Sequence, residues 1–137
     1  MYSLTYVSSA RKTLSQADLE QILETSRINN ARDNITGMLL YADGNIIQVL
    51  EGEHSKVRDC FQRIQQDDRH HSAIVLLEED IQERAFPEWT MGFKQVTQED
   101  VRQLSGKNEY MNTTAGQLDL SRRTVQILLN NFRHMVR

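Results

Sequence analysis

The sequence has little of several features on which whole classes of protein depend. It contains a single cysteine, Cys60, so the chain cannot form an internal disulfide, and this is typical of a reducing compartment. No apolar run approaches the roughly 18 residues that cross a membrane. The N-terminus also lacks the basic segment followed by an apolar one that marks a signal peptide. We therefore expect a cytoplasmic protein with no membrane partner.

Basic charge is not in excess either. The 16 Lys and Arg residues are outnumbered by 19 Asp and Glu residues, which gives a formal net charge of -3. Because nucleic-acid-binding domains usually carry a basic patch, we expect no nucleic-acid partner. The motifs of serine hydrolases, P-loops and dinucleotide-binding loops are missing, and no Cys or His pair stands at metal-ligand spacing. These absences argue against an enzyme and against a metal site.

The chain does contain an alternation of short strand patterns and helical patterns. One helix is predicted to begin after an N-cap at Ser15 and to end near Asn29-Asn30, because two asparagines suit a helix C-terminus. A second helix is predicted from about Ser55 to Asp67, with Cys60 as a small core residue. The predicted strands cover residues 2–8, 36–42, 46–51, 73–78 and about 91–96.

The order β-α-β-β-α-β-β predicts an α+β, ferredoxin-like fold with a mixed sheet and two helices on one face. In this arrangement we expect the strands 2–8 and 46–51 to lie side by side and parallel in the centre. We also expect the two helices to run parallel and to end at the same side. Asn29 and Asn30 would then meet the segment Arg69-His70-His71 at one end of the domain.

The last part of the chain follows a different pattern. Residues 98–105 read as a short helix and residues 106–117 as a polar loop, and residues 121–136 carry an apolar stripe at helical spacing. We therefore predict a domain over residues 1–96 and a helical extension over residues 97–137. The stripe has to be covered, so the extension should pack on the free face of the sheet or at a subunit interface.

Two polar side chains occupy core positions of the central strands. Gln48 shares one face of its strand with Ile46 and Leu50, and Tyr6 shares a face of the first strand with Leu4. If these strands adjoin, the phenol and the carboxamide can meet. They can satisfy each other inside the core, or both can face a ligand between the sheet and the helices, because a few polar groups on an apolar wall are typical of a cofactor site.

Other polar residues have equally ordinary structural interpretations. Asn29-Asn30 can be a helix cap, the Arg69-His70-His71 run can be a solvated loop, and Trp89 and Met91 can fill the edge of the sheet. The residues alone do not separate these interpretations from a ligand site.

Several segments together resemble one known family. The blocks LTYVSSA, ETSRINNARDNITGMLLY, IIQVLEGE, RIQQDDRHHS and FPEWTMGF, which span residues 2–96, resemble BLUF domains (blue light using flavin) in order and spacing. The tail resembles the short BLUF proteins, which carry C-terminal helices in place of an attached output enzyme. The resemblance implies a photoreceptor that signals through a homo-oligomer or a separate downstream protein.

The resemblance also implies a binding site for a flavin, either FAD or FMN, between the two helices. Tyr6 would be the photoactive tyrosine, Gln48 would lie between Tyr6 and the flavin, and Trp89 and Met91 would pass on the signal. Asn30 would bind the carbonyl edge of the ring. The other residues that would border the flavin are Ile22, Ser26, Asn29, Arg63, Asp67, Arg69 and His70.

Two other functions compete with this one. The chain could be a ferredoxin-like interaction or ligand-binding module without photochemistry. A purified protein without flavin would favour this alternative. It could also be a small hydrolase of the acylphosphatase kind, but Arg11 after the first strand lacks the glycine-rich cradle that such an enzyme needs.

Overall fold

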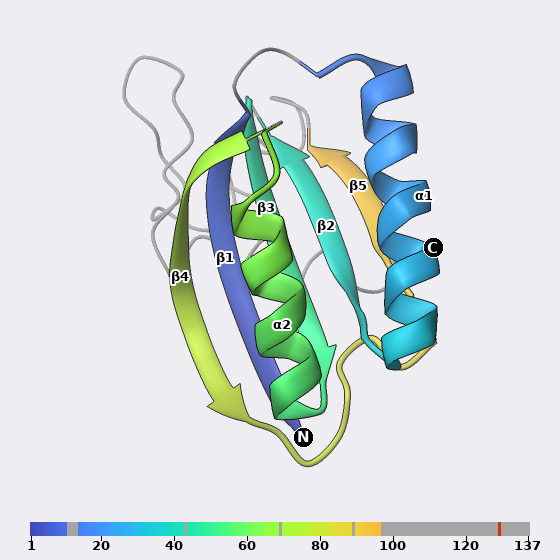
Figure 1. The fold of residues 1–137 in the computed structure, drawn as a ribbon, viewed down its shortest axis with the longest axis vertical. Helices are drawn as coiled ribbons and strands as arrows, with labels where there is room; N and C mark the ends of the chain where they lie inside the picture. The colour runs from blue at the N-terminus through green and yellow to red at the C-terminus, as the bar shows by residue number, and fades with distance from the viewer. Residues whose placement is uncertain (11–13, 43, 69, 89, 97–128, 130–137) are drawn as a thin grey trace, which may run out of the picture.

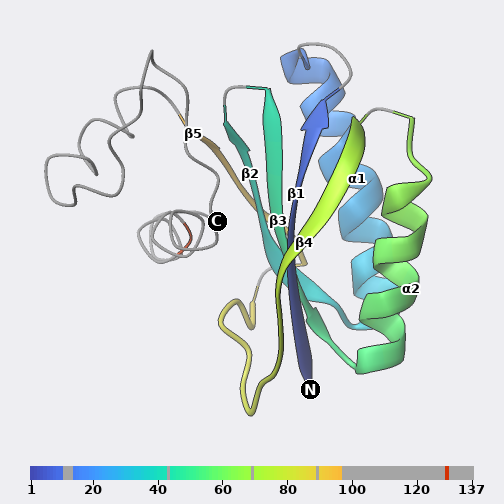
Figure 2. The same ribbon diagram turned by 90° about the vertical axis from the view of Figure 1, so that its left-hand side faces the viewer.

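The computed structural model describes residues 1–10, 14–42, 44–68, 70–88, 90–96 and 129. The described strands form one sheet in the order β4-β1-β3-β2-β5 (Figure 1), and both helices cover the same face of it (Figure 2). The predicted α+β, ferredoxin-like arrangement is therefore confirmed. The elements are β1 (Tyr2–Ala10), α1 (Gln16–Asp33), β2 (Thr36–Ala42), β3 (Asn45–Gly52), α2 (His54–Gln65), β4 (His70–Asp80) and β5 (Gly92–Val96).

The two central strands adjoin as predicted, but their direction was predicted wrongly. β1 pairs antiparallel with β3, and Tyr6 stands directly opposite Gln48 in the register. The helix α1 carries the chain back so that β2 runs parallel to β1 with a gap between them, and the β2–β3 hairpin places β3 in that gap. A strand that returns through a hairpin must be antiparallel to both neighbours. The parallel pairing of β2 with β5 makes the sheet mixed.

The helices were also predicted to run parallel, and this is wrong for the same reason. Each helix runs against the strand that precedes it, and β1 and β3 are antiparallel, so α1 and α2 run in opposite directions (Figure 1). Their C-terminal ends therefore point in opposite directions. Asp67, just after α2, still lines one cavity with Asn29 and Asn30. Of the residues predicted to meet these asparagines, Arg69 lies outside the described residues, and His70 and His71 belong to β4 rather than to a loop.

Local sequence explains where α1 begins and ends. The Ser15 hydroxyl accepts a hydrogen bond from the backbone N–H of Asp18 at 3.1 Å, and the Asp18 carboxylate accepts one from the Ser15 N–H at 3.0 Å. This capping box confirms the predicted start. The end lies at Asn34 and not at Asn29-Asn30, because Asn34 adopts the left-handed conformation (φ 56°) that terminates the helix.

Gly37 explains how closely β2 and β3 approach each other. A Cβ atom at this position would lie 1.9 Å from the backbone oxygen of Val49. Any other residue would therefore push β2 away from β3, which carries Gln48. Gly44, with a φ of 79°, makes the turn of the hairpin that the Asp43-Gly44 pair predicted.

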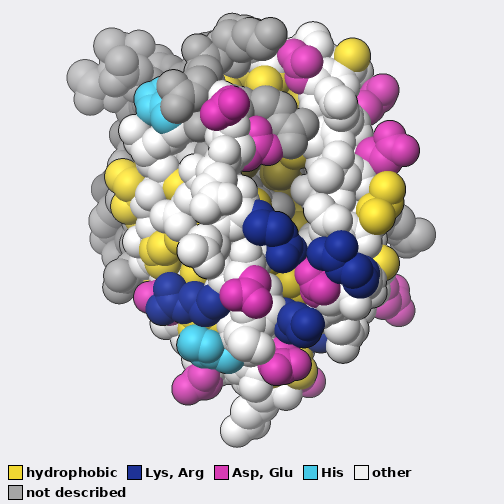
Figure 3. Space-filling model, in the orientation of Figure 1, with side chains coloured by type: hydrophobic (Ala, Val, Ile, Leu, Met, Phe, Trp, Pro, Cys, Tyr) yellow, Lys and Arg dark blue, Asp and Glu magenta, His cyan; other side chains and the backbone are white. Residues whose placement is uncertain are grey.

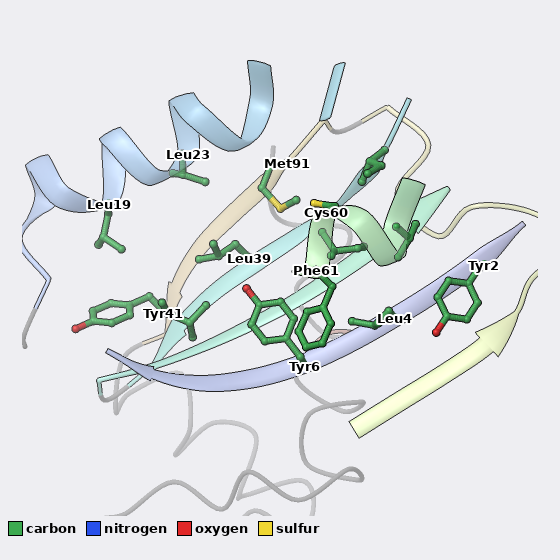
Figure 4. Close-up of a cluster of buried hydrophobic side chains, with 14 of the residues drawn as sticks. Tyr2, Leu4, Tyr6, Leu19, Leu23, Leu39, Tyr41, Cys60, Phe61 and Met91 are labelled. Atoms are coloured by element: carbon green, nitrogen blue, oxygen red, sulfur yellow. The ribbon is translucent and has the colours of Figure 1, made fainter. Parts of the chain in front are cut away.

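The central strands bury side chains on both faces of the sheet. Towards the helices, Leu4, Tyr6 and Phe61 lie in the main core (Figure 4), and on the other face Met38 and Ile47 are fully buried. Leu129 lies in a helix and is 8% exposed. The predicted helix 98–105 and loop 106–117 lie outside the described residues, as does the rest of the predicted helix 121–136. No helix in the described ranges is long and apolar enough to cross a membrane.

Tyr2 joins three elements at the far end of β1. Its hydroxyl donates a hydrogen bond to Glu78 of β4, and Arg58 of α2 pairs with Glu78 at 2.9 Å. The Tyr2 ring also contacts the His54 ring, with centroids 4.3 Å apart. Burial, and then the hydrogen bond to the Glu78 carboxylate, raise the pKa of Tyr2 to about 12.

This pKa predicts a loss of stability in alkali. Tyr2 titrates near its ordinary value of 10.0 in the unfolded chain and near 12 in the folded chain, so between these values the folded state binds more protons. The contribution of Tyr2 to stability is complete below pH 10 and falls as the pH rises towards 12. Compared with Tyr2→Phe, the wild type should lose more stability across this window, as measured by urea unfolding midpoints. If the midpoints of the wild type and of Tyr2→Phe fall equally with pH, the raised pKa is not that of Tyr2.

Candidate functional site

A cavity of about 210 Å³ lies between the sheet and the two helices. Its polar lining includes amides, hydroxyls and charged groups, and its apolar lining comes from both helices and the sheet. Lys and Arg side chains gather along the gap between α1 and α2 (Figure 3). The lining residues are Tyr6, Ile22, Thr25, Ser26, Asn29, Asn30, Leu39, Ile46, Gln48, Cys60, Arg63, Ile64 and Asp67.

Tyr6 and Gln48 form the floor of the cavity, where β1 and β3 adjoin. Each is only 2% exposed, and the Tyr6 hydroxyl donates a hydrogen bond to Oε1 of Gln48. The Gln48 amide donates in turn to the sulfur of Met91 at 3.4 Å. The carboxamide thus accepts from one side chain and donates to another, which only a group with both functions can do.

The environment of Tyr6 keeps its phenol neutral. Its ring lies beside Phe61 of α2, with centroids 5.2 Å apart (Figure 4). Burial raises the pKa of Tyr6 far above its ordinary value, with smaller contributions from Cys60 and Asp67. The hydroxyl therefore keeps its proton at neutral pH.

Asn30 connects the inner end of α1 to the segment before β5. It is 2% exposed, and its Nδ2 donates to the Thr90 carbonyl at 2.8 Å. The Cys60 thiol donates weakly to Oδ1 of Asn30 at 3.8 Å, and burial raises the pKa of this thiol. Arg27, one turn earlier on α1, donates from Nε to the Met91 carbonyl at 3.1 Å. Two α1 side chains therefore hold Thr90 and Met91 beside α1.

An ion pair links the two helices beside the cavity. Arg63 of α2 contacts Asp33 of α1 at 3.2 Å, and its side chain is 46% exposed. Hydrogen bonds from Arg32, and then from Arg63, hold the pKa of Asp33 below its ordinary value. Arg63 thus presents a cation at the cavity while remaining accessible to solvent.

The structure brings most of the predicted site residues together. Tyr6 and Gln48 line the cavity, and Met91 contacts Gln48. Trp89 and Arg69 lie outside the described residues, and of His70 only the backbone position in β4 is described. The predicted cofactor-binding residues that line the cavity are Ile22, Ser26, Asn29, Asn30, Gln48, Arg63 and Asp67.

Sequence reasoning missed part of the lining. Thr25 lies one turn before Asn29 on α1, so the helical stripe that contains Ile22 and Ser26 could have revealed it. Cys60 was interpreted as a core residue, and it is buried, but it also faces the cavity. The remaining missed residues are apolar and carry no signal that separates them from ordinary core: Leu39, Ile46 and Ile64.

The chain is similar to known proteins in sequence and in fold. Residues 1–92 match the model of the BLUF family, described as sensors of blue light using FAD. Photoactivated adenylate cyclase subunit beta of Euglena longa is 41% identical over 90 residues, which are 65% of this chain and 10% of that protein. Subunit alpha of Euglena gracilis is 36% identical over 86 residues, which are 63% of this chain and 8% of that protein. The chain thus spans about a tenth of the length of these relatives.

The matches to solved structures cover more of the chain than the matches to these relatives do. The dark state of BlrB, a BLUF protein, has a TM-score of 0.75 and 32% identity, and the match covers 97% of this chain and 95% of that one. The ground state of BlsA has a TM-score of 0.82 and 29% identity, with coverage of 96% and 87%.

Proposed function

This chain belongs to the BLUF family of blue-light flavin photoreceptors, and we propose that its flavin lies in the cavity between the sheet and the two helices. The observation that carries this proposal is the pair formed by Tyr6 and Gln48, a buried phenol hydrogen-bonded to a carboxamide at the floor of that cavity. A pair that served only to satisfy each other would need no open space beside it.

The lining suits a flavin ring. An isoalloxazine has apolar faces and one edge of carbonyl and N–H groups, so it needs apolar walls and amides at one end. Ile22 and Ile64 supply apolar surface, and Asn29, Asn30 and Gln48 supply amides. Asn30 uses one N–H for Thr90, and an amide side chain has more donor and acceptor positions than that. Arg63 can meet a phosphate of the cofactor, and we propose FAD, in keeping with the family description.

The chemistry follows from what Tyr6 and Gln48 can exchange. A bound flavin would supply absorption of blue light and, when excited, a strong oxidant. Tyr6 can give up an electron together with the proton of its hydroxyl, and the Gln48 oxygen that accepts this hydrogen bond is in place to receive the proton. Because the Gln48 amide also donates, it can pass on a proton and return rotated or as the other tautomer.

The electron and the proton would return to Tyr6, so the product of such a cycle is a changed set of hydrogen bonds. Gln48 donates to the Met91 sulfur in the structure, so a rotated amide would break that contact. Met91 precedes β5 directly, and its carbonyl is held by Arg27. A change at Gln48 would therefore reach β5 and the segment before it, which is the kind of two-state element a switch requires.

Output would pass through a surface of this domain. We propose that the message goes to a second copy of the chain or to a separate protein. We also propose that residues 97–137 form an extension that packs on the sheet face opposite α1 and α2. Leu129, which lines a second cavity with Val49 and Phe86, supports that placement.

A visible spectrum tests the proposed function. The purified protein should be yellow, bind FAD, shift its absorption to the red under blue light and recover in the dark. Ser26→Trp should fill the cavity and abolish flavin binding while circular dichroism stays unchanged, whereas Glu24→Trp, exposed on the same helix and outside the lining, should bind normally. A colourless protein that takes up neither FAD nor FMN would overturn the proposal.

A further inference from the structure

Glu51 is a buried carboxylate on the strand that carries Gln48, and the proposed photochemistry gives it no role. It is 2% exposed and lines the second cavity, of about 180 Å³, on the sheet face opposite the helices. A buried charge is costly unless it is paired or fully hydrogen-bonded. Glu51 therefore needs partners, and they show what it does.

The partners of the Glu51 carboxylate are backbone groups of one connection. Oε2 accepts from the Ala85 N–H at 2.7 Å, and Oε1 accepts from the Phe86 N–H at 2.9 Å. Oε1 also accepts from the Thr36 hydroxyl at 3.4 Å. Hydrogen bonds to an ionised oxygen are stronger than neutral ones. The carboxylate thus fixes the connection between β4 and β5 to the end of β3.

Arg84 fixes the same connection from its own side. It donates to the Glu51 backbone carbonyl at 2.9 Å, to the Thr36 hydroxyl at 2.8 Å and to the Asn34 carbonyl at 2.8 Å. Residues 84–86 are therefore held at the ends of β2 and β3 and at the cap of α1. We call this set of contacts the Glu51 anchor.

The other end of the connection is held near the cavity between the sheet and the two helices. Asn30 and Arg27 bind the carbonyls of Thr90 and Met91, and the Met91 sulfur accepts from Gln48. Few residues separate Phe86 from Thr90, so the position of one attachment limits the positions that the other can take. Phe86 is 5% exposed and lines the second cavity, as Leu129 does. The connection therefore touches both faces of the sheet.

We propose that Glu51 is a positioning residue that fixes residues 84–86, so that Met91 is presented to Gln48 and a change in the Gln48 amide reaches Phe86 and Leu129 on the opposite face. Gln48 and Glu51 stand on opposite faces of β3, and the connection links the two faces outside the strand. This inference rests on the proposed function, because it assigns a route for the signal that the photochemistry would generate.

The test compares Glu51→Gln with Glu79→Gln, which changes an exposed carboxylate of the same cavity. Gln keeps the shape of Glu but can accept at one oxygen only, so one of the two backbone N–H groups loses its acceptor. Amide hydrogen exchange at Ala85 and Phe86, measured in the dark, should accelerate roughly tenfold in Glu51→Gln and stay unchanged in the control.

The same variants are then followed through the light response. The rate of dark recovery of the red shift should change by roughly threefold or more in Glu51→Gln. The contact between Met91 and Gln48 favours one arrangement of the Gln48 amide over the other, and a displaced Met91 would weaken that preference. Trp89 is the chain's single tryptophan and lies in sequence between the two attachments, so tryptophan emission comes from this segment. The difference in emission between dark and lit protein should shrink in Glu51→Gln and persist in Glu79→Gln.

The outcomes separate the two proposals. Faster amide exchange with wild-type recovery and wild-type emission would mean that Glu51 is structural only, and this would overturn the inference. A wild type without a red shift would instead overturn the proposed function, while the exchange measurement still reports on the anchor. If Glu51→Gln does not fold, Arg84→Gln removes the anchor from the other side without changing a buried carboxylate, and the same changes are expected.

Discussion

Gln48→Leu should give a yellow protein that no longer shifts its absorption to the red. Leucine fills nearly the same space, so the cavity should still bind flavin. It can neither accept from the Tyr6 hydroxyl nor donate to the Met91 sulfur, and both contacts exist in the wild type. Without a group that accepts and donates, the proton of Tyr6 has no route and no new hydrogen bond can form. Steady-state difference spectra under blue light measure the effect.

The same substitution should weaken the fold by a modest amount. Removing one partner from a buried hydrogen bond costs about 1–3 kcal/mol, which urea unfolding in the dark can resolve. Gln62→Leu is the matched control, because Gln62 is exposed on α2 and outside the cavity lining. A Gln48→Leu protein with a red shift of normal size and normal recovery would exclude the amide from the light response.

The pairing of Tyr6 with Gln48 was predictable because it depends on simple periodicity. Alternation along each strand placed both residues towards the same layer, and the ferredoxin-like order made the strands neighbours. Their antiparallel direction was available from the same topology and was overlooked. This error did not affect the predicted pair, because side chains opposite each other on neighbouring strands meet whichever way the strands run. The antiparallel direction did reverse one helix relative to the other.

Asn30 shows why helix ends are harder to predict. Two adjacent asparagines suit a C-terminal cap, yet Asn30 lies inside α1 because its amide is satisfied by the Thr90 carbonyl. That partner is distant in sequence, so no local pattern reveals it. The actual cap, Asn34, has the same side chain. Local chemistry therefore allowed both positions, and a tertiary contact selected between them.

Glu51 shows a signal that was present but not used. It shares a face of β3 with Ile47 and Val49, so a charge stands in line with apolar residues on a central strand. Such a charge must find partners. Sequence could thus have indicated an important carboxylate there, but not that its partners are the N–H groups of Ala85 and Phe86. Those depend on how a connection without regular structure folds back over the sheet.

Tyr6→Phe should abolish the normal light response while leaving the cavity and its flavin in place. The substitution removes one oxygen and with it the group that would give both an electron and a proton. Burial raises the pKa of Tyr6, so the phenol itself is the donor at ordinary pH, and phenylalanine offers no substitute. Loss of the hydrogen bond to Gln48 leaves a buried acceptor without its donor and should cost about 1–3 kcal/mol of stability, so the protein should remain folded.

The measurement is the initial rate at which the red-shifted state forms under constant blue light. Tyr2→Phe is the matched control, because Tyr2 lies on the same strand and the same face but outside the cavity lining. It should form the red-shifted state at the wild-type rate. If Tyr6→Phe forms that state as fast as the wild type, another side chain supplies the electron. Tyr41, buried in the same core, would then be the first residue to replace. The hydrogen bond between Tyr6 and Gln48 would in that case serve packing alone.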